Sequence, residues 1–288
     1  FWLKTSGSSK AESLPSRPRA YRLALKENTS LKEIDLQGNQ ITAAGKIALL
    51  EGKGMSQQNA GAAAAATGLP GHDLTWDDLR TRWAELTSRQ KVVGFYGHNK
   101  GEFSCFSNFY DQAKEPFDFE VPQEFFAPGI EEGEPLPRTV SCAFSEKAIM
   151  LCKAAVMGDA ASYRAIACAK DPRTAKWLGR SIGNFNNDLW RITVCAVAFQ
   201  VVYQKFSKTP RLQPTLLGTG DKIIAEVAPG DCVWGIGMGA DDERVATPSA
   251  WQGSNILGWA LMEAREVLQN PNGANQEAAD RGRVRRRW

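Results

Sequence analysis

The sequence is poor in the side chains that metal centres and acid–base triads use most. Its 288 residues include only two histidines, His72 and His98, and no two of the six cysteines form a C-x-x-C pair. The chain therefore has few of the histidine and paired cysteine residues that a zinc site or a Ser-His-Asp triad requires. We expect no metal ion and no cofactor, and we interpret His98, which follows an aromatic pair, as a structural residue.

Long hydrophobic runs are also missing. No apolar stretch reaches the roughly 20 residues that a membrane span needs, and the opening "FWLKTSGSSKAESLPSRPRA" lacks the apolar region of a signal peptide. Most cysteines lie among apolar neighbours, as buried free thiols do. These features predict a reducing compartment, the cytosol or the nucleus, and we expect a cytoplasmic protein with no membrane partner.

The body of the chain carries no excess charge of either sign. The formal net charge is +3, but five of the 35 basic residues lie in the final "RGRVRRRW", which leaves 30 against 32 acidic residues. We expect this basic tail, residues 270–288, to be a solvated, disordered end. Contact with nucleic acid or with an acidic partner is the alternative.

Residues 1–50 contain one pattern with a recognisable period. The spacing L-x-x-I-x-L-x-x-N-x-I begins at Leu31 and ends at Ile41, and it resembles a leucine-rich repeat. One repeat cannot bury its own faces, so we expect the last repeat of a truncated array, with a chance amphipathic segment as the alternative. A start at Phe1 agrees with a fragment, and the repeat would dock a protein partner.

The rest of the chain divides by composition. Residues 51–74 are rich in Gly, Ala and Gln and read as a flexible linker, and residues 75–90 form an amphipathic helix with Thr75 as its cap. Residues 91–269 then alternate strand and helix patterns. Within them, 111–139 hold five prolines and many acids, and we interpret this stretch as a long surface insertion with room for a short hairpin.

Helices dominate the remainder. The patterns predict a helix over Ser145 to Met157, two short helices capped by Asp159 and Asp171, and a long apolar helix in "NDLWRITVCAVAFQVVYQKF". A buried strand "DKIIAEVAP", a glycine-rich loop and a closing helix capped by Ser254 follow. The predicted fold class is α+β, a compact helix-rich domain with a small sheet.

The stretch "SEKAIMLCKA" places two charges on one apolar helix. Glu146 and Lys153 are seven residues apart, so they project from nearly the same face. The two side chains either form a purely structural ion pair or line a cavity that binds a ligand. Glu146 lies in the first turn, where the helix dipole favours the ionised carboxylate.

A series of motifs then becomes specific. "FYGH", "GEFSCFSNFY", "FSEKAIMLCKA", "DPRTAKWLGR", "LLGTGDKIIAEVAPGDCVWGIG" and the pattern W-x-G-x-N-x-L-G follow in this order between Val92 and Leu268. In order and spacing they resemble the NADAR family. The resemblance implies an N-glycosidase, since the family includes enzymes that act on phosphoribosylated riboflavin intermediates and enzymes that remove ADP-ribose from nucleobases.

The resemblance also implies roles for individual residues. Glu146 matches the catalytic carboxylate of the family, and Trp190, Asp231 and Trp234 match its other motif positions. Cleavage of a ribose C–N bond develops oxocarbenium character, which a fixed carboxylate stabilises. Lys153 then either pairs with Glu146 or meets a substrate phosphate.

Ten residues are candidates for substrate binding. Alternatives stay open for several: the tryptophans as core aromatics, Asp231 as a turn former, Arg180 as a cation at a helix C-terminus, and Asn255 as a residue of the helix start. The glycine loop would let backbone N–H groups approach a phosphate. The candidates are Phe95, Tyr96, Asn108, Lys153, Arg180, Trp190, Asp231, Trp234, Gly235 and Asn255.

The predicted function is hydrolysis of the C–N bond between a phosphoribosyl or ADP-ribosyl group and a nucleobase-like amine. The substrate is a small molecule or ADP-ribosylated nucleic acid, and Glu146 is the catalytic residue. The alternative is a module that binds ADP-ribose or a nucleotide without turnover and acts through contacts of the leucine-rich repeat.

Overall fold

The structure is a computed structural model that describes residues 70–72, 74–99, 101–130 and 134–270, together with the strands of the first 34 residues. The chain forms two compact units, Phe1–Ala66 and Thr67–Trp288. The linker predicted over 51–74 and the tail predicted over 270–288 lie almost wholly outside the described residues.

The first unit contains a small antiparallel sheet. Strand β1 (Trp2–Thr5) lies between β2 (Glu12–Ser13) and β3 (Leu31–Ile34). A stack of repeats would align successive strands in one direction, whereas β3 runs antiparallel to β1. The rest of the predicted repeat and its helix lie outside the described residues, so the structure does not support the leucine-rich repeat.

The second unit is a helix-rich α+β domain, as the sequence predicts. Its α-helices are α4 (Trp76–Glu85), α5 (Ser145–Val156), α6 (Ala160–Ala167), α7 (Pro172–Arg180), α8 (Asn187–Lys208), α9 (Gln213–Leu217) and α10 (Ile256–Gln269). Its strands are β4 (Val92–Phe95), β5 (Phe117–Glu120), β6 (Thr139–Cys142) and β7 (Ile223–Glu226). The 3-10 turns among the described residues of this unit are η1 (Ser104–Phe106), η2 (Gln123–Phe125), η3 (Pro210–Leu212), η4 (Glu243–Ala246) and η5 (Pro248–Ala250).

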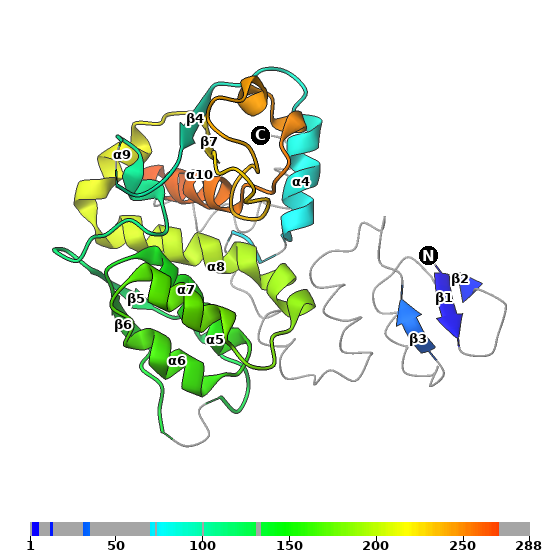
Figure 1. The fold of residues 1–288 in the computed structure, drawn as a ribbon, viewed down its shortest axis with the longest axis vertical. Coiled ribbons are helices and arrows are strands. Elements are labelled where there is room, and N and C mark those ends of the chain that lie inside the picture. Colours follow the sequence, from blue (N-terminus) through cyan, green and yellow to red (C-terminus); the bar gives the residue numbers. More distant parts are fainter. Residues whose placement is uncertain are drawn as a thin grey trace. The chain divides into compact units, whose positions relative to one another are not determined.

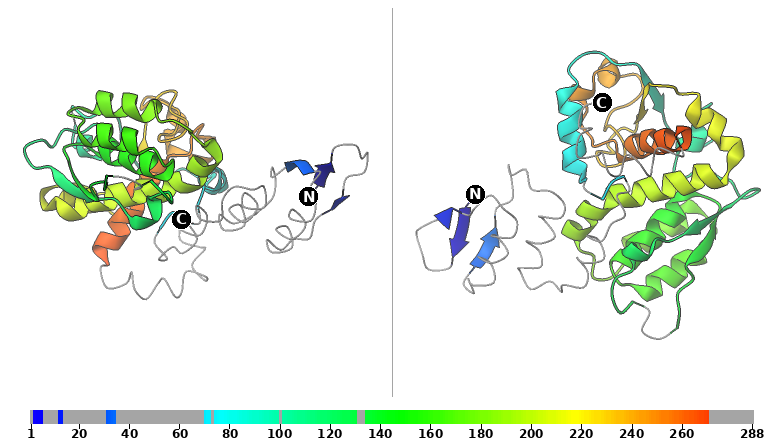
Figure 2. Two further views of the ribbon diagram at one scale, coloured as in Figure 1. Left: turned by 90° about the horizontal axis from the view of Figure 1, so that it is seen from below. Right: turned by 180° about the vertical axis from the view of Figure 1, so that it is seen from behind.

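Helix α8 is the centre of this domain. It crosses the middle, with α5, α6, α7 and the β5–β6 hairpin on one side and β4, β7, α10 and α4 on the other (Figures 1 and 2). It packs against α10, α5 and β5, and fifteen of its residues are buried. The helix is apolar around most of its circumference because it is covered on both sides. None of the helices in the described ranges is both long and apolar enough to span a membrane.

The two strand pairs have opposite senses. β4 and β7 are parallel, with Phe95 opposite Glu226, and β5 and β6 are antiparallel. Parallel strands present their carboxyl ends at the same edge, and ligands of α/β sheets bind at such edges. Glu226 and the residue that follows Phe95 therefore meet at one edge of the domain.

The capping signals of the sequence are confirmed at three helices. Thr75 and Asp78 form a reciprocal capping box at α4, and Asp159 and Asp171 each accept a backbone N–H bond at the start of α6 and α7. The prediction fails at α10, where the cap is Asn255 in the left-handed region (φ 51°) rather than Ser254. The reason is that the Asn255 side chain bonds strand β7, as described below.

Residues 111–139 are not a surface insertion, although the short hairpin that the sequence allowed is present as the antiparallel pair β5–β6. This stretch forms β5, η2 and the approach to β6, and its large apolar side chains belong to the core. Phe117 and Phe119 are 1% and 0% exposed, and Gln204 of α8 bonds both the N–H and the carbonyl of Glu120. The proline and acid count masked an alternation of aromatic side chains with period two, which marks a half-buried strand.

Phe119→Ala tests this correction. Truncation of a fully buried phenylalanine should lower the free energy of unfolding by about 3–5 kcal/mol. Trp177→Ala, at a side chain 65% exposed, is the control and should change it by less than about 0.5 kcal/mol. Chemical denaturation of both variants measures the difference, and an equally small effect at Phe119 would contradict burial of this segment.

Candidate active site

Glu146 begins the site at the start of α5. Its side chain is only 6% exposed, and its backbone N–H donates to the carbonyl oxygen of Asn108 at 2.9 Å. Burial raises the pKa of Glu146 to about 7, with Asp231 adding to the rise and with Lys176, Arg180 and Lys153 opposing it. The sequence led us to expect a carboxylate kept ionised by the helix dipole, but desolvation outweighs the opposing charges. The carboxyl therefore exchanges its proton near neutral pH.

Lys153 makes no ion pair with Glu146 within the described part of the chain. Its Nζ donates to the carbonyl oxygen of Gly179 at 2.8 Å and lies 4.3 Å from the centroid of the Phe185 ring and 5.8 Å from that of Trp190. Burial lowers the pKa of Lys153, and Glu146 partly restores it. The lysine therefore joins α5 to the end of α7 and keeps its charge within electrostatic reach of Glu146.

Helix α7 supplies the other cations. Lys176 is half-buried with its Nζ 5.3 Å from the centroid of the Phe109 ring, whereas Arg180 is exposed at the helix end. The close approach of α7 to α5 depends on Gly179, because a Cβ there would collide with the side chain of Met150. Sequence reasoning missed Lys176, whose position four residues before Arg180 on the same helix was the available signal.

The loop after β7 brings in the second acid. Asp231 accepts hydrogen bonds at Oδ1 from the backbone N–H groups of Val233, at 3.1 Å, and Trp234, at 2.9 Å. This is the turn-forming arrangement that the sequence left open, and it fixes the carboxylate within electrostatic reach of Glu146. Asp231 thus shapes the loop and adds negative charge to the site.

Glu226 is a third acid, and the sequence analysis did not single it out. It ends β7 and is partly buried, with Oε2 shielded from solvent. Burial raises its pKa to about 8, and Asp231 and Glu146 add to the rise while Lys176 opposes it. An acid at the end of the apolar run "DKIIAEVAP" was the signal in the sequence, although a strand end is an ordinary place for a solvated glutamate.

The remaining predicted residues fall into two groups. Trp190 is 8% exposed, Trp234 is half-buried, and Tyr96 is 66% exposed at the carboxyl edge of β4. Asn108 is 9% exposed, and its Oδ1 has no hydrogen-bond partner within the described residues. Together with Glu146 and the cations, these four residues come from elements that meet around the acids.

The other group supports the site from behind. Phe95 is buried edge-on against Phe106, with 5.5 Å between the ring centroids. The Asn255 amide is committed to strand β7, since it donates to the Ile224 carbonyl at 2.9 Å and accepts from the Glu226 N–H at 3.1 Å. A Cβ at Gly235 would lie 2.7 Å from the Glu226 carbonyl, so glycine there permits the loop to fold against β7.

A buried cation, Lys205, fixes the loop that carries Asn108. Its side chain is 1% exposed, and its Nζ donates to the carbonyl oxygens of Cys105 at 2.6 Å and Ser107 at 3.3 Å. Burial lowers its pKa to about 8. The lysine thereby joins α8 to the loop that ends in Asn108, whose backbone carbonyl accepts the Glu146 N–H.

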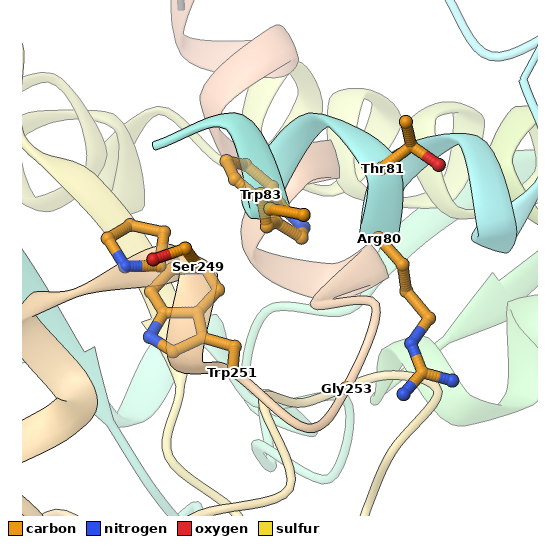
Figure 3. Close-up of a pocket in the computed structure, with 8 residues that line it drawn as sticks. Arg80, Thr81, Trp83, Ser249, Trp251 and Gly253 are labelled. Atoms are coloured by element: carbon orange, nitrogen blue, oxygen red, sulfur yellow. The ribbon is translucent and has the colours of Figure 1, made fainter. Parts of the chain in front are cut away.

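Two cavities lie away from these residues. One, of about 300 Å³, lies between α4 and η5 and is walled by Trp83, Trp251 and Arg80 (Figure 3). The other, of about 500 Å³, lies between α4 and α10 and mixes the acids Asp221, Glu263 and Glu266 with Arg82 and Arg265. Neither contains a predicted site residue. In the described part of the chain no group of three or more His, Cys, Asp or Glu side chains is arranged to hold a metal ion.

The fold and the acid cluster define a helix-rich α+β domain with a buried carboxyl group, Glu146, among the charges of Lys176, Arg180 and Lys153. Residues 94–269 match the NADAR domain, and the chain belongs to the NADAR family.

The curated relatives agree with this assignment. An N-glycosidase of Acanthamoeba polyphaga mimivirus is 34% identical over 62% of this chain and 97% of its own length. Protein irg-1 of Caenorhabditis elegans is 33% identical over 66% of this chain and 86% of its own length. An N-glycosidase of Nostoc punctiforme is 32% identical over 39% of this chain and 65% of its own length. The predicted enzyme class, a hydrolase of N-glycosyl bonds, is in agreement with these names.

Glu146→Gln tests the burial of this carboxyl through stability. The folded protein keeps a proton that the unfolded chain releases near the ordinary glutamate pKa of 4.5, so the wild-type free energy of unfolding falls as pH rises from there to about 7. Glutamine has no such proton to lose. The variant should match the wild type near pH 4 and exceed it by about 1–3 kcal/mol above pH 7.

Denaturation curves across this pH range measure the effect. Glu102→Gln, at an exposed position, is the matched control and should track the wild type throughout. A Glu146→Gln protein that tracks the wild type as well would contradict the raised pKa.

Proposed function

We propose that the chain is an N-glycosidase that hydrolyses the C–N bond between a phosphoribosyl or ADP-ribosyl group and a nucleobase-like amine. The observation that carries the proposal is Glu146, a carboxyl 6% exposed that lies among three cations and two further acids. Membership in the NADAR family and the two relatives named N-glycosidases support it.

The arrangement of charge suits this substrate class. Departure of the base leaves positive charge at the anomeric carbon, which an ionised Glu146 stabilises either directly or by activating water. The same substrate carries a phosphate, for which Lys176 and Arg180 supply positive charge. Lys153 can add to this charge, because only one of its donors is used by Gly179.

The aromatic side chains suit the base. Trp190 and Trp234 offer flat surfaces on which a base can stack. Asp231 bonds the backbone through Oδ1, and its other oxygen, Oδ2, can accept from a ribose hydroxyl or an exocyclic amine. The three exposed large aromatics of the described residues are Tyr96, Trp177 and Phe185. Tyr96 lies at the strand edge where Glu226 ends β7, and Phe185 lies against Lys153, so two of the exposed rings lie near the site.

These exposed rings favour, within the proposal, a base that is still attached to a nucleic acid strand. Stacking of unpaired bases on aromatic side chains beside lysines and arginines is the usual mode of single-strand recognition. A free phosphoribosylated riboflavin intermediate is the other substrate that the site accommodates. The leucine-rich repeat as a protein-docking module and the cytoplasmic location stay predictions.

A hydrolysis assay decides between these possibilities. Wild type should release free base from a phosphoribosylated pyrimidine intermediate of riboflavin synthesis or from an oligonucleotide with ADP-ribosylated guanine, and the preferred substrate identifies the branch. Glu146→Gln should lower kcat by about 100- to 10,000-fold, because a neutral amide cannot stabilise the oxocarbenium or activate water.

Glu102→Gln is again the control and should retain the wild-type rate. Release of base by wild type and equally by Glu146→Gln would remove Glu146 from the mechanism. No release of base by wild type, with ADP-ribose still bound, would favour the non-catalytic binding module instead.

A further inference from the structure

The proposed reaction leaves one requirement without a residue. When the C–N bond breaks, its electron pair moves to the base nitrogen, and most bases leave only if that nitrogen gains a proton. Glu146 serves the anomeric carbon as an anion and therefore cannot hold this proton at the same time. A second group in the site must carry it, and Glu226 meets the conditions.

The backbone of Glu226 is fixed on two sides. Its N–H donates to Oδ1 of Asn255 at 3.1 Å, and its carbonyl oxygen accepts from the N–H of Ile236 at 2.9 Å. Gly235 lies against the same carbonyl without room for a Cβ. The position of the Glu226 side chain at the carboxyl edge of β7 is thus set by groups whose own bonds are satisfied.

The carboxyl group of Glu226, in contrast, is not satisfied. Oε2 is shielded from solvent and has no hydrogen-bond partner within the described residues. Asn108, whose carbonyl caps Glu146, leaves a second unpartnered buried oxygen in the same site. Buried polar atoms without partners are rare in folded proteins, and here they indicate that a ligand completes their hydrogen bonds.

The charged groups around Glu226 favour its protonated form. Asp231 from the following loop and Glu146 from α5 are acids, and Lys176 from α7 opposes them. The neighbouring strand contributes the exposed Tyr96, and α10 contributes the neutral amide of Asn255. Desolvation acts in the same direction as the acids and is the largest cause of the raised pKa of about 8.

We propose that Glu226 is a second catalytic residue of this site, the general acid that protonates the leaving base. The inference rests on the proposed N-glycosidase function. Two carboxyl groups with separated environments, one ionised and one protonated at the working pH, are the usual means by which a site performs acid and base chemistry together. Glu146 is the carboxylate that the proposed function already uses at the anomeric carbon, so Glu226, whose buried Oε2 has no partner within the described residues, is the acid.

The step balances in atoms and charge. The C–N bond breaks, its electron pair goes to the base nitrogen, and the proton of the Glu226 carboxyl group bonds to that nitrogen. Water then forms a bond to the anomeric carbon and gives a proton to the Glu146 carboxylate. The products are free base and a ribose with a hydroxyl group, and solvent returns a proton to Glu226 and removes one from Glu146.

The test compares the pH dependence of kcat/KM for wild type and Glu226→Gln on whichever nucleobase substrate the wild type hydrolyses. Wild-type activity should rise as pH passes about 7, where Glu146 ionises, and fall as pH passes about 8, where Glu226 ionises. Glu226→Gln should lose about 100-fold or more and lose the fall at high pH, because glutamine resembles the protonated carboxyl in shape but has no proton to transfer.

A second substrate separates proton transfer from a structural role. The base of a ribosyl pyridinium 5′-phosphate departs as a neutral molecule and needs no proton. Glu226→Gln should therefore hydrolyse it within about threefold of the wild-type rate, whereas Glu146→Gln should not. Asn255→Ala, which alters only the support of β7, should lower the thermal midpoint and keep the fall at high pH.

The outcomes are distinct. A Glu226→Gln enzyme with the wild-type pH profile, or a wild type without a fall at high pH, would overturn the assignment while leaving the N-glycosidase function intact. Absence of base release by wild type at every pH would overturn the proposed function itself.

Discussion

Burial of two carboxyl groups beside a small set of cations is the constraint on which the rest of the site depends. Glu146 belongs to α5 and Glu226 to β7, two elements that lie to either side of α8 in Figure 1 and are far apart in the sequence. Desolvation of such groups opposes folding, since each must either keep a proton or lie unpaired in an apolar surrounding. Lys176, Arg180 and Lys153 offset part of the cost for Glu146, and Lys176 offsets part of it for Glu226. The protein thereby loses part of its free energy of unfolding and gains two carboxyl groups that exchange protons near neutral pH.

The support for these carboxyl groups is mostly backbone. Lys205 donates to backbone carbonyls just before Asn108, and the Asn108 carbonyl accepts from the Glu146 N–H. The Glu226 N–H donates to Asn255, and the Glu226 carbonyl accepts from the Ile236 N–H. Side chains that the sequence offered as substrate contacts are thus divided between two tasks. Phe95, Gly235 and Asn255 support the site from behind, whereas Asn108 keeps a buried Oδ1 without a partner within the described residues. This division follows from the accounting of buried polar groups.

Local patterns predicted much of the domain because its helices carry their own signals. Caps at Thr75, Asp159 and Asp171, and the apolar length of α8, mark elements that form from sequence-near contacts. Long-range features were out of reach. The burial of the aromatic side chains of β5 was hidden by the prolines and acids around them. Asn255 occupies the N-cap position of α10 without a side-chain cap bond because its amide bonds β7. Glu226 gained importance only when the loop after β7 folded back against it. Residues 1–50 could be assigned a repeat from spacing alone, yet the antiparallel pairing of β3 does not support one.

The proposed chemistry depends on two glutamates that keep their protons to near neutral pH. A carbon NMR titration of the protein labelled at the glutamate side-chain carboxyl carbons tests it directly, with Glu146→Gln and Glu226→Gln to assign the two signals. One carboxyl should titrate near pH 7 and one near pH 8, well above the remaining glutamates, and each signal should be absent from its own variant. Titration of every glutamate near the ordinary value of 4.5 would contradict it.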